Sequence, residues 1–165
     1  MVTRLRAGMG FYRQWKGWSD ARKILFCLTC LLLVVIGRAL ADEADAILGE
    51  WYTKDDKALV QIFRAGDVYN GRIVWLKEPK NDDGSDKLDT HNPDEAKQNQ
   101  PIIGLNLANG FVYKGKNTWV EGTIYDPDNG KTYSCKMTLK QDGSLKVRGF
   151  IGVSLIGRTQ VWTRK

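Results

Sequence analysis

Cysteine and histidine are scarce in this chain, which has three cysteines and one histidine in 165 residues. Cys27 and Cys30 lie within an apolar run near the N-terminus, and only Cys135 lies beyond it. A zinc site with three protein ligands needs more histidine or cysteine than residues 42–165 contain. His91 stands in a polar stretch without a serine or cysteine motif beside it, so no nucleophile–histidine pair is evident. We therefore expect no metal site, no cofactor and no enzyme.

The single cysteine beyond the apolar run cannot form an internal disulfide, so the fold must be stabilised by its core. Cys135 alternates in register with Tyr133 and Met137, which predicts a buried and unreactive thiol. Cys27 and Cys30 have the spacing of a redox motif. Their place inside an apolar run argues against both a thioredoxin-like role and a zinc half-site.

The sequence also lacks an apolar run long enough to cross a membrane. Residues 24–36 form an uncharged run of 13 residues, whereas a spanning helix needs about 20. Basic residues precede this run and Ala39-Leu40-Ala41 follows it, the pattern of a secretory signal peptide. We expect residues 1–41 to be removed after Ala41, leaving a mature chain, 42–165, that is periplasmic or secreted and meets a membrane only during export. An uncleaved anchor, a lipoprotein signal at Cys30 and a start at Met9 are the alternatives.

The formal net charge of +6 belongs to the predicted signal peptide. Residues 1–41 hold seven of the 25 basic residues and one of the 19 acidic residues, which leaves 18 of each in the mature chain. A formally neutral domain offers no general electrostatic attraction to phosphate backbones. We therefore expect no nucleic-acid partner.

Strand patterns dominate the mature chain. The clearest is 119–139, where two strand-like runs flank the turn residues Asp126-Pro127-Asp128-Asn129-Gly130. Strand-like runs recur along the mature chain at close spacing with short turns between them. This pattern predicts a single small antiparallel up-and-down β-barrel of about eight strands. The other runs are 48–53, 59–64, 68–76, 102–107, 110–113, 145–151 and 158–164.

Within 68–76, the alternation places Tyr69, Gly71, Ile73 and Trp75 on one face. A glycine inside a strand indicates a bulge, a bend or the close approach of another group, so we expect one of these at Gly71.

Residues 77–100 interrupt the strands and predict a long polar loop. Asn92 followed by Pro93 and two acidic residues has the pattern of a helix start, with Asn92 as N-cap, and predicts one short helix over 93–98. The acidic stretch 81–89 does not match the spacing of a calcium-binding loop, so we expect it to be solvated. Asp89 and Asn92 are expected to bond the backbone where the loop enters the helix.

Six short motifs are spread along nearly the whole mature chain: Gly49-Glu50-Trp51, Tyr69-Asn70-Gly71-Arg72-Ile73, Gly122-Thr123-Ile124-Tyr125-Asp126-Pro127, Gly130-Lys131-Thr132-Tyr133, Arg148-Gly149-Phe150-Ile151-Gly152 and Gly157-Arg158-Thr159-Gln160. In content and order they resemble a bacterial family catalogued as domain of unknown function 2147. The resemblance implies a lipocalin-like β-barrel located outside the cytoplasm. It implies no established activity and supplies no catalytic residues.

The chain is similar more widely to lipocalins and other calycins. Those folds open with Gly-x-Trp, here Gly49-Glu50-Trp51, and pack a basic residue from the last strand across that tryptophan. Arg158 or Arg164 could supply this residue, because a guanidinium stacks well on an indole face.

Two functional hypotheses of different classes stay open at this point. An eight-stranded barrel lies at the boundary between a packed interior and a cavity for one small ligand. In the first hypothesis an aromatic-lined interior binds a small, partly apolar or lipid-like ligand. Arg72, Arg148 or Arg158 could then bind polar groups of the ligand, although alternation with apolar neighbours favours solvent-facing positions for Arg72 and Arg148. In the second hypothesis, a filled barrel acts through its surface on an envelope protein partner. The candidate ligand-binding residues are Trp51, Tyr69, Trp75, Trp119, Tyr125, Arg158 and Trp162.

Overall fold

The computed structural model describes residues 19–153 and 156–165, and the chain divides into two compact units, Met1–Asp42 and Glu43–Lys165. Helix α2, Asp20–Asp45, covers the described part of the first unit and continues into the start of the second. Much of its apolar surface is exposed, as at Leu25 and Leu33. Among the described residues, no helix has the length and apolarity that crossing a membrane requires. Of the basic residues that open the predicted signal peptide, Arg22 and Lys23 lie in α2, whereas Arg4, Arg6, Arg13 and Lys16, together with Met9, lie outside the described residues.

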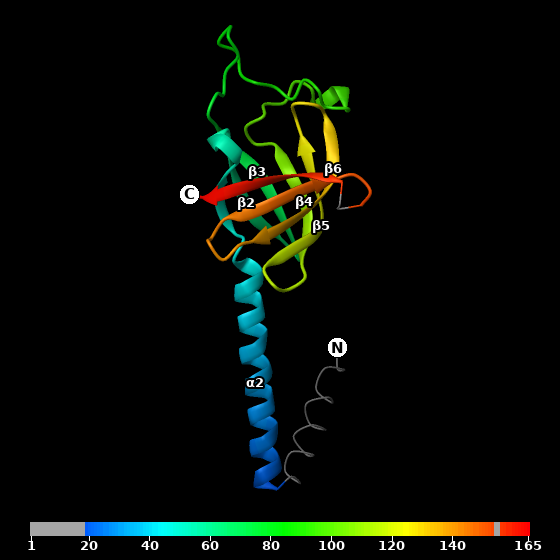
Figure 1. The fold of residues 1–165 in the computed structure, drawn as a ribbon. Helices are drawn as coiled ribbons and strands as arrows, with labels where there is room; N and C mark the ends of the chain where they lie inside the picture. The colour runs from blue at the N-terminus through cyan, green and yellow to red at the C-terminus, as the bar shows by residue number, and fades with distance from the viewer. Residues whose placement is uncertain (1–18, 154–155) are drawn as a thin grey trace, which may run out of the picture. The chain divides into compact units, whose positions relative to one another are not determined.

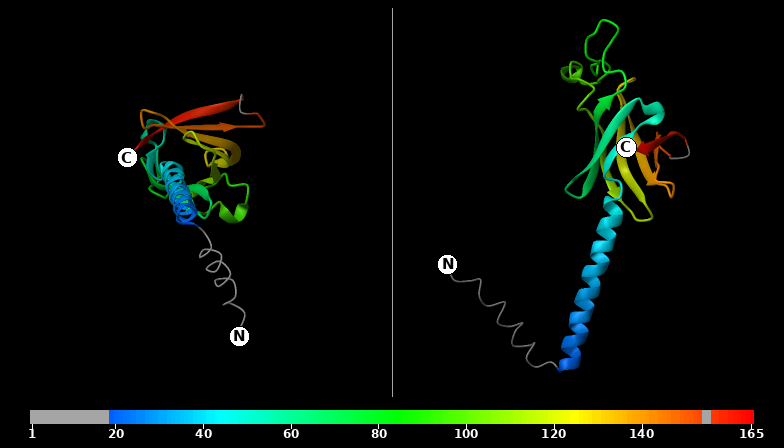
Figure 2. Two further views of the ribbon diagram at one scale, coloured as in Figure 1. Left: turned by 90° about the horizontal axis from the view of Figure 1, so that it is seen from below. Right: turned by 90° about the vertical axis from the view of Figure 1, so that its left-hand side faces the viewer.

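The second unit is a closed barrel in which each antiparallel strand pairs with the next and β8 pairs with β1 (Figures 1 and 2). The all-β, up-and-down prediction is confirmed. The strands are β1 Gly49–Tyr52, β2 Ala58–Ala65, β3 Val68–Leu76, β4 Asn106–Tyr113, β5 Thr118–Asp126, β6 Lys131–Leu139, β7 Leu145–Phe150 and β8 Gly157–Arg164, with short 3-10 helices η1 Lys54–Asp56 and η2 Glu95–Lys97.

Two local predictions around the long loop differ from the structure. The runs 102–107 and 110–113 are not two strands: residues 102–105 belong to the loop, and β4 begins only at Asn106. The loop residue Ile102 is buried against the core, which explains why its sequence resembles a strand. The predicted helix is the short η2, whose N-cap is Asp94, because the Asp94 carboxylate accepts from the Ala96 amide and Asn92 instead accepts from the Asp94 amide.

Glycines at two strand positions allow the barrel wall to close tightly. At Gly71 the register of β3 against β4 shifts, as predicted, and a Cβ there would lie 3.1 Å from Val60. At Gly122 a Cβ would overlap the ring of Phe111, which lies flat against the glycine. Both sites show side chains from neighbouring strands occupying the space that a larger residue would need.

Candidate functional site

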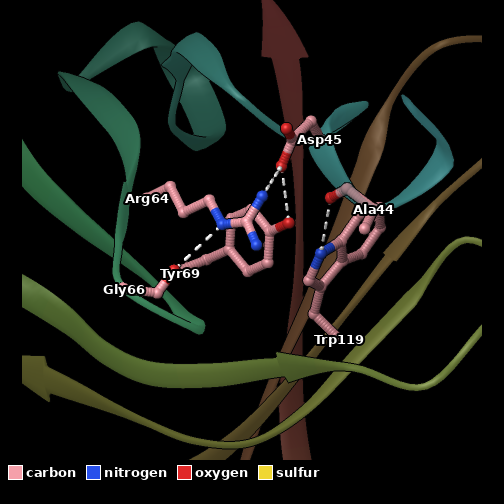
Figure 3. Close-up of polar contacts among 6 residues, drawn as sticks. All are labelled: Ala44, Asp45, Arg64, Gly66, Tyr69 and Trp119. Atoms are coloured by element: carbon pink, nitrogen blue, oxygen red, sulfur yellow. Dashed lines mark hydrogen bonds and ion pairs between the residues drawn. The ribbon is translucent and has the colours of Figure 1, made fainter. Parts of the chain in front are cut away.

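One end of the barrel is closed by the segment that enters it, Glu43–Leu48, which we call the entry segment (Figure 3). The Trp119 indole donates to the Ala44 carbonyl at 3.1 Å. The Asp45 carboxylate accepts from the Tyr69 hydroxyl at 2.6 Å and lies 3.5 Å from Arg64. Burial and this carboxylate raise the pKa of Tyr69 to about 12. The entry segment is therefore fixed by polar contacts from β2, β3 and β5.

The last strand fixes the same segment from the other side. The Arg164 guanidinium lies 4.2 Å from the centre of the Trp51 ring and donates to the carbonyls of Ala46 and Leu48 at 2.6 and 2.9 Å. The Trp51 indole donates to the Ile47 carbonyl at 2.9 Å. Of the two arginines expected to cover Trp51, Arg164 is the one that does so, and its position opposite Trp51 in the β1–β8 pairing accounts for this.

The interior at the closed end is filled by the barrel's own side chains. Trp51 and Trp119 are 0% exposed, and Trp162 and Tyr69 are almost completely buried. A cavity with room for a ligand would leave accessible area on the side chains that line it. These four candidate ligand-binding residues are therefore packing residues of the core in this structure.

Trp75 does not face the interior, and this corrects its predicted place beside Ile73. In the β2–β3 pairing Val60 lies opposite Ile73 and Leu59 opposite Trp75, so Val74 is an extra residue that reverses the alternation. Trp75 is consequently 42% exposed on the outer face, where its ring meets that of Tyr52 edge-on at 6.2 Å.

Tyr125 also lies outside the interior, where it anchors the long loop. Its hydroxyl donates to one oxygen of Asp89 at 2.7 Å, and the Asn92 amide donates to the other at 2.7 Å. Asp89 is fully buried, so these two bonds satisfy a carboxylate that is removed from water. Burial and the Asp89 carboxylate raise the pKa of Tyr125 to about 12. The prediction that Asp89 bonds the backbone through its side chain was wrong, because both of its oxygens accept from side chains. The same prediction is confirmed for Asn92, whose side chain accepts from the Asp94 amide.

A second contact holds the same loop against the β5–β6 turn. A Cβ added at Gly130, where φ is +69°, would overlap the carbonyl oxygen of His91. The backbone of His91 is thus packed on this glycine. Together with Asp89, this contact fixes the loop at two points and gives His91 a structural position.

At the other end of the barrel, the inner face of strands β5, β6, β7 and β8 is accessible. Arg158 lies opposite Gly149 on β7, and Gly149 lies opposite the buried Cys135 on β6, so all three share the inner face. Arg158 is exposed and, within residues 19–153 and 156–165, has no carboxylate within ion-pair distance. We call the partly accessible inner residues at this end the rim set: Ile124, Tyr133, Gly149, Arg158 and Gln160.

The family model described as "Uncharacterized protein conserved in bacteria (DUF2147)" matches residues 49–164, which span all eight strands. The chain belongs to this family. Among solved structures, a Helicobacter pylori protein described as belonging to the lipocalin family is similar, with a TM-score of 0.63 and 22% identity over 72% of this chain and 82% of that one. No curated protein matches the sequence.

This member of the DUF2147 family therefore has a lipocalin-like barrel, with Gly49-Glu50-Trp51 and Arg164 placed as the resemblance to lipocalins implies. Cys135 lies beside Gly149, but its thiol is buried and burial raises its pKa to about 12. A thiol in this state is a poor nucleophile. No group of three potential metal-ligating side chains occurs among the described residues.

Proposed function

We propose that this DUF2147 protein is an exported binding protein that takes a small amphipathic anionic molecule at the rim set. The observation that carries the proposal is the contrast between the two ends of the inner face. The closed end is filled by fully buried tryptophans, whereas the other end is accessible and carries an inward-facing cation, Arg158.

The chemistry of the rim set supports this ligand class. Arg158 can form charge-assisted hydrogen bonds with a carboxylate or phosphate. Ile124 and Tyr133 supply apolar surface on the neighbouring strands, and Gly149 has no side chain to occupy the space between them. A fatty acid or similar lipid-like molecule combines these two features. The likeness to a lipocalin-family protein supports small-ligand binding in the same way.

Export is the second part of the proposal. The N-terminal residues have the basic, apolar and Ala-x-Ala order of a signal peptide. Cleavage after Ala41 would release the chain two residues before Ala44, so the entry segment would remain with the barrel. Trp119, Tyr69 and Arg164 all form hydrogen bonds to this segment. Cleavage further along the chain would remove these bonds, so they favour a cleavage site before the segment.

The proposal is tested by titrating residues 42–165 with a fluorescent fatty acid and with its uncharged methyl ester. We expect the acid to bind more tightly, and Arg158→Gln to remove the preference with a loss of roughly ten-fold or more, as for a hydrogen bond to a charged group. Lys146→Gln, which removes an exposed cation on the outer face of β7, is the matched control and should keep the preference.

Equal affinity for acid and ester, or an Arg158→Gln protein that behaves like the unmodified one, would refute the rim site. That result would favour the other hypothesis, a filled barrel that acts on an envelope partner. The burial of Trp51, Trp119 and Trp162 is the observation that keeps this second candidate open.

A further inference from the structure

The charges of the mature chain are divided between two parts of the barrel, although they sum to zero. Residues 42–130 hold 10 basic and 17 acidic residues, whereas residues 131–165 hold eight basic residues and one acidic residue, Asp142. The second part is β6, β7 and β8 with their connections. Three adjacent strands of the wall are thus strongly cationic.

The outer face of these strands brings three cations together. Lys136 on β6 lies directly opposite Arg148 on β7. Lys146 lies two residues before Arg148 on β7 and therefore on the same face. Like charges directly opposite each other destabilise a sheet. Neither Lys136 nor Lys146 has a carboxylate within ion-pair distance in the part of the chain that the structure describes. We call Lys136, Lys146 and Arg148 the basic face.

The hairpin that joins β7 to β8 carries exposed apolar side chains next to this face. Ile151, Val153 and Ile156 are 70%, 60% and 73% exposed, and we call them the apolar tip. Figures 1 and 2 show the orange and red hairpin projecting past the neighbouring strands. Clustered apolar exposure of this kind marks an interaction surface in a soluble domain.

We propose that the apolar tip and the basic face dock this barrel on the surface of an anionic phospholipid bilayer. The order of the groups matches the order of a membrane: the apolar side chains project furthest and reach the acyl boundary, and the cations lie behind them at the level of the phosphates. An acidic protein would complement the basic face but would leave the apolar tip unexplained. From the sequence we expected the chain to meet a membrane only during export. The proposed surface adds a contact between the mature domain and a membrane.

The test is flotation of residues 42–165 with vesicles of equal parts phosphatidylglycerol and phosphatidylcholine, compared with vesicles of phosphatidylcholine alone. We expect binding to the anionic vesicles that falls as salt is added. Ile151→Ser with Ile156→Ser should abolish it, and Lys136→Gln with Lys146→Gln should weaken it about five-fold for each cation removed. Lys57→Gln with Lys77→Gln removes two exposed cations that are not part of β6, β7 or β8 and is the matched control, which should bind normally.

All variants alter exposed or half-buried side chains, and unchanged thermal unfolding confirms that each is folded. Binding that is absent, equal on both kinds of vesicle, or unaffected by the tip and basic-face variants would overturn the proposal. Retention by acidic proteins but not by vesicles would overturn it in favour of a protein partner. None of the substituted residues belongs to the rim set, so failure here leaves ligand binding at the rim unaffected.

Discussion

At the scale of single residues, Trp51 joins the first strand, the last strand and the entry segment. Its ring is fully buried beneath Arg164, and its indole nitrogen donates to Ile47. Replacing it leaves a large void and also removes the surface on which the guanidinium lies. We expect Trp51→Ala to lower the free energy of unfolding by about 3–5 kcal/mol, as for other buried aromatics.

Trp75→Ala is the matched control, because the same truncation at this half-exposed outer position should cost much less. Urea unfolding of both variants provides the comparison. Equal stability of the Trp51→Ala protein and the unmodified chain would show that Trp51 does not close the barrel.

Two glycines on the inner face should respond differently to an added methyl group. A Cβ at Gly122 would overlap the Phe111 ring, whereas one at Gly149 would be in ordinary contact with Ile124 and Tyr133 at 3.5 and 3.6 Å. We expect Gly122→Ala to destabilise the barrel by about 1–3 kcal/mol, the usual cost of overpacking. Gly149→Ala should leave thermal unfolding nearly unchanged, and a reversed order of the two melting temperatures would contradict the assigned packing.

At the scale of elements, the long loop between β3 and β4 depends on Asp89 and Tyr125. The pKa of Tyr125 is raised above its ordinary value of 10.0 to about 12, so folding favours the neutral hydroxyl. The stability that this bond contributes is therefore complete below pH 10 and is lost as the pH rises toward 12. Ionised Tyr125 would lie against the Asp89 carboxylate and repel it.

We expect amide hydrogen exchange in residues 77–105 to accelerate, beyond its ordinary dependence on pH, when the pH passes from 10 toward 12. Tyr125→Phe should have faster exchange in this loop already at neutral pH and a weaker further change. Tyr69 has a similarly raised pKa, so exchange in the entry segment serves as an internal reference that the Tyr125 substitution should leave unaltered. A loop whose exchange is the same in both proteins would contradict the anchor.

The strands show how far local patterns predict an element. The bounds of 68–76 were predicted correctly, but the face of Trp75 was not, because Val74 inserts one residue and reverses the alternation. No residue in that strand signals the insertion; the partner strand sets it. Asp89 was missed as a buried group for a related reason, since its partner Tyr125 is 36 residues away and only the folded loop brings them together.

At the scale of the whole molecule, the barrel was predictable because turn residues and period-two patterns repeat along the mature chain. Whether its interior is filled was not predictable, since that depends on how side chains from eight strands meet in three dimensions. From the sequence alone, Trp51, Trp119 and Trp162 could line a ligand cavity or fill the core. The structure of the closed barrel shows that all three are buried. The pairing of Arg158 with Gly149 places it on the inner face at the accessible end, and its part in ligand binding stays a prediction.

The central claim is that the accessible end of this barrel holds a small amphipathic anion. The most direct test is mass spectrometry of the protein exported by its own host, recorded under non-denaturing conditions and again after organic extraction. The account predicts the mass of residues 42–165 plus one stoichiometric ligand, which extraction releases as an anionic, partly apolar molecule. The bare mass of the chain in both spectra would contradict it and would shift attention to the barrel's outer surface.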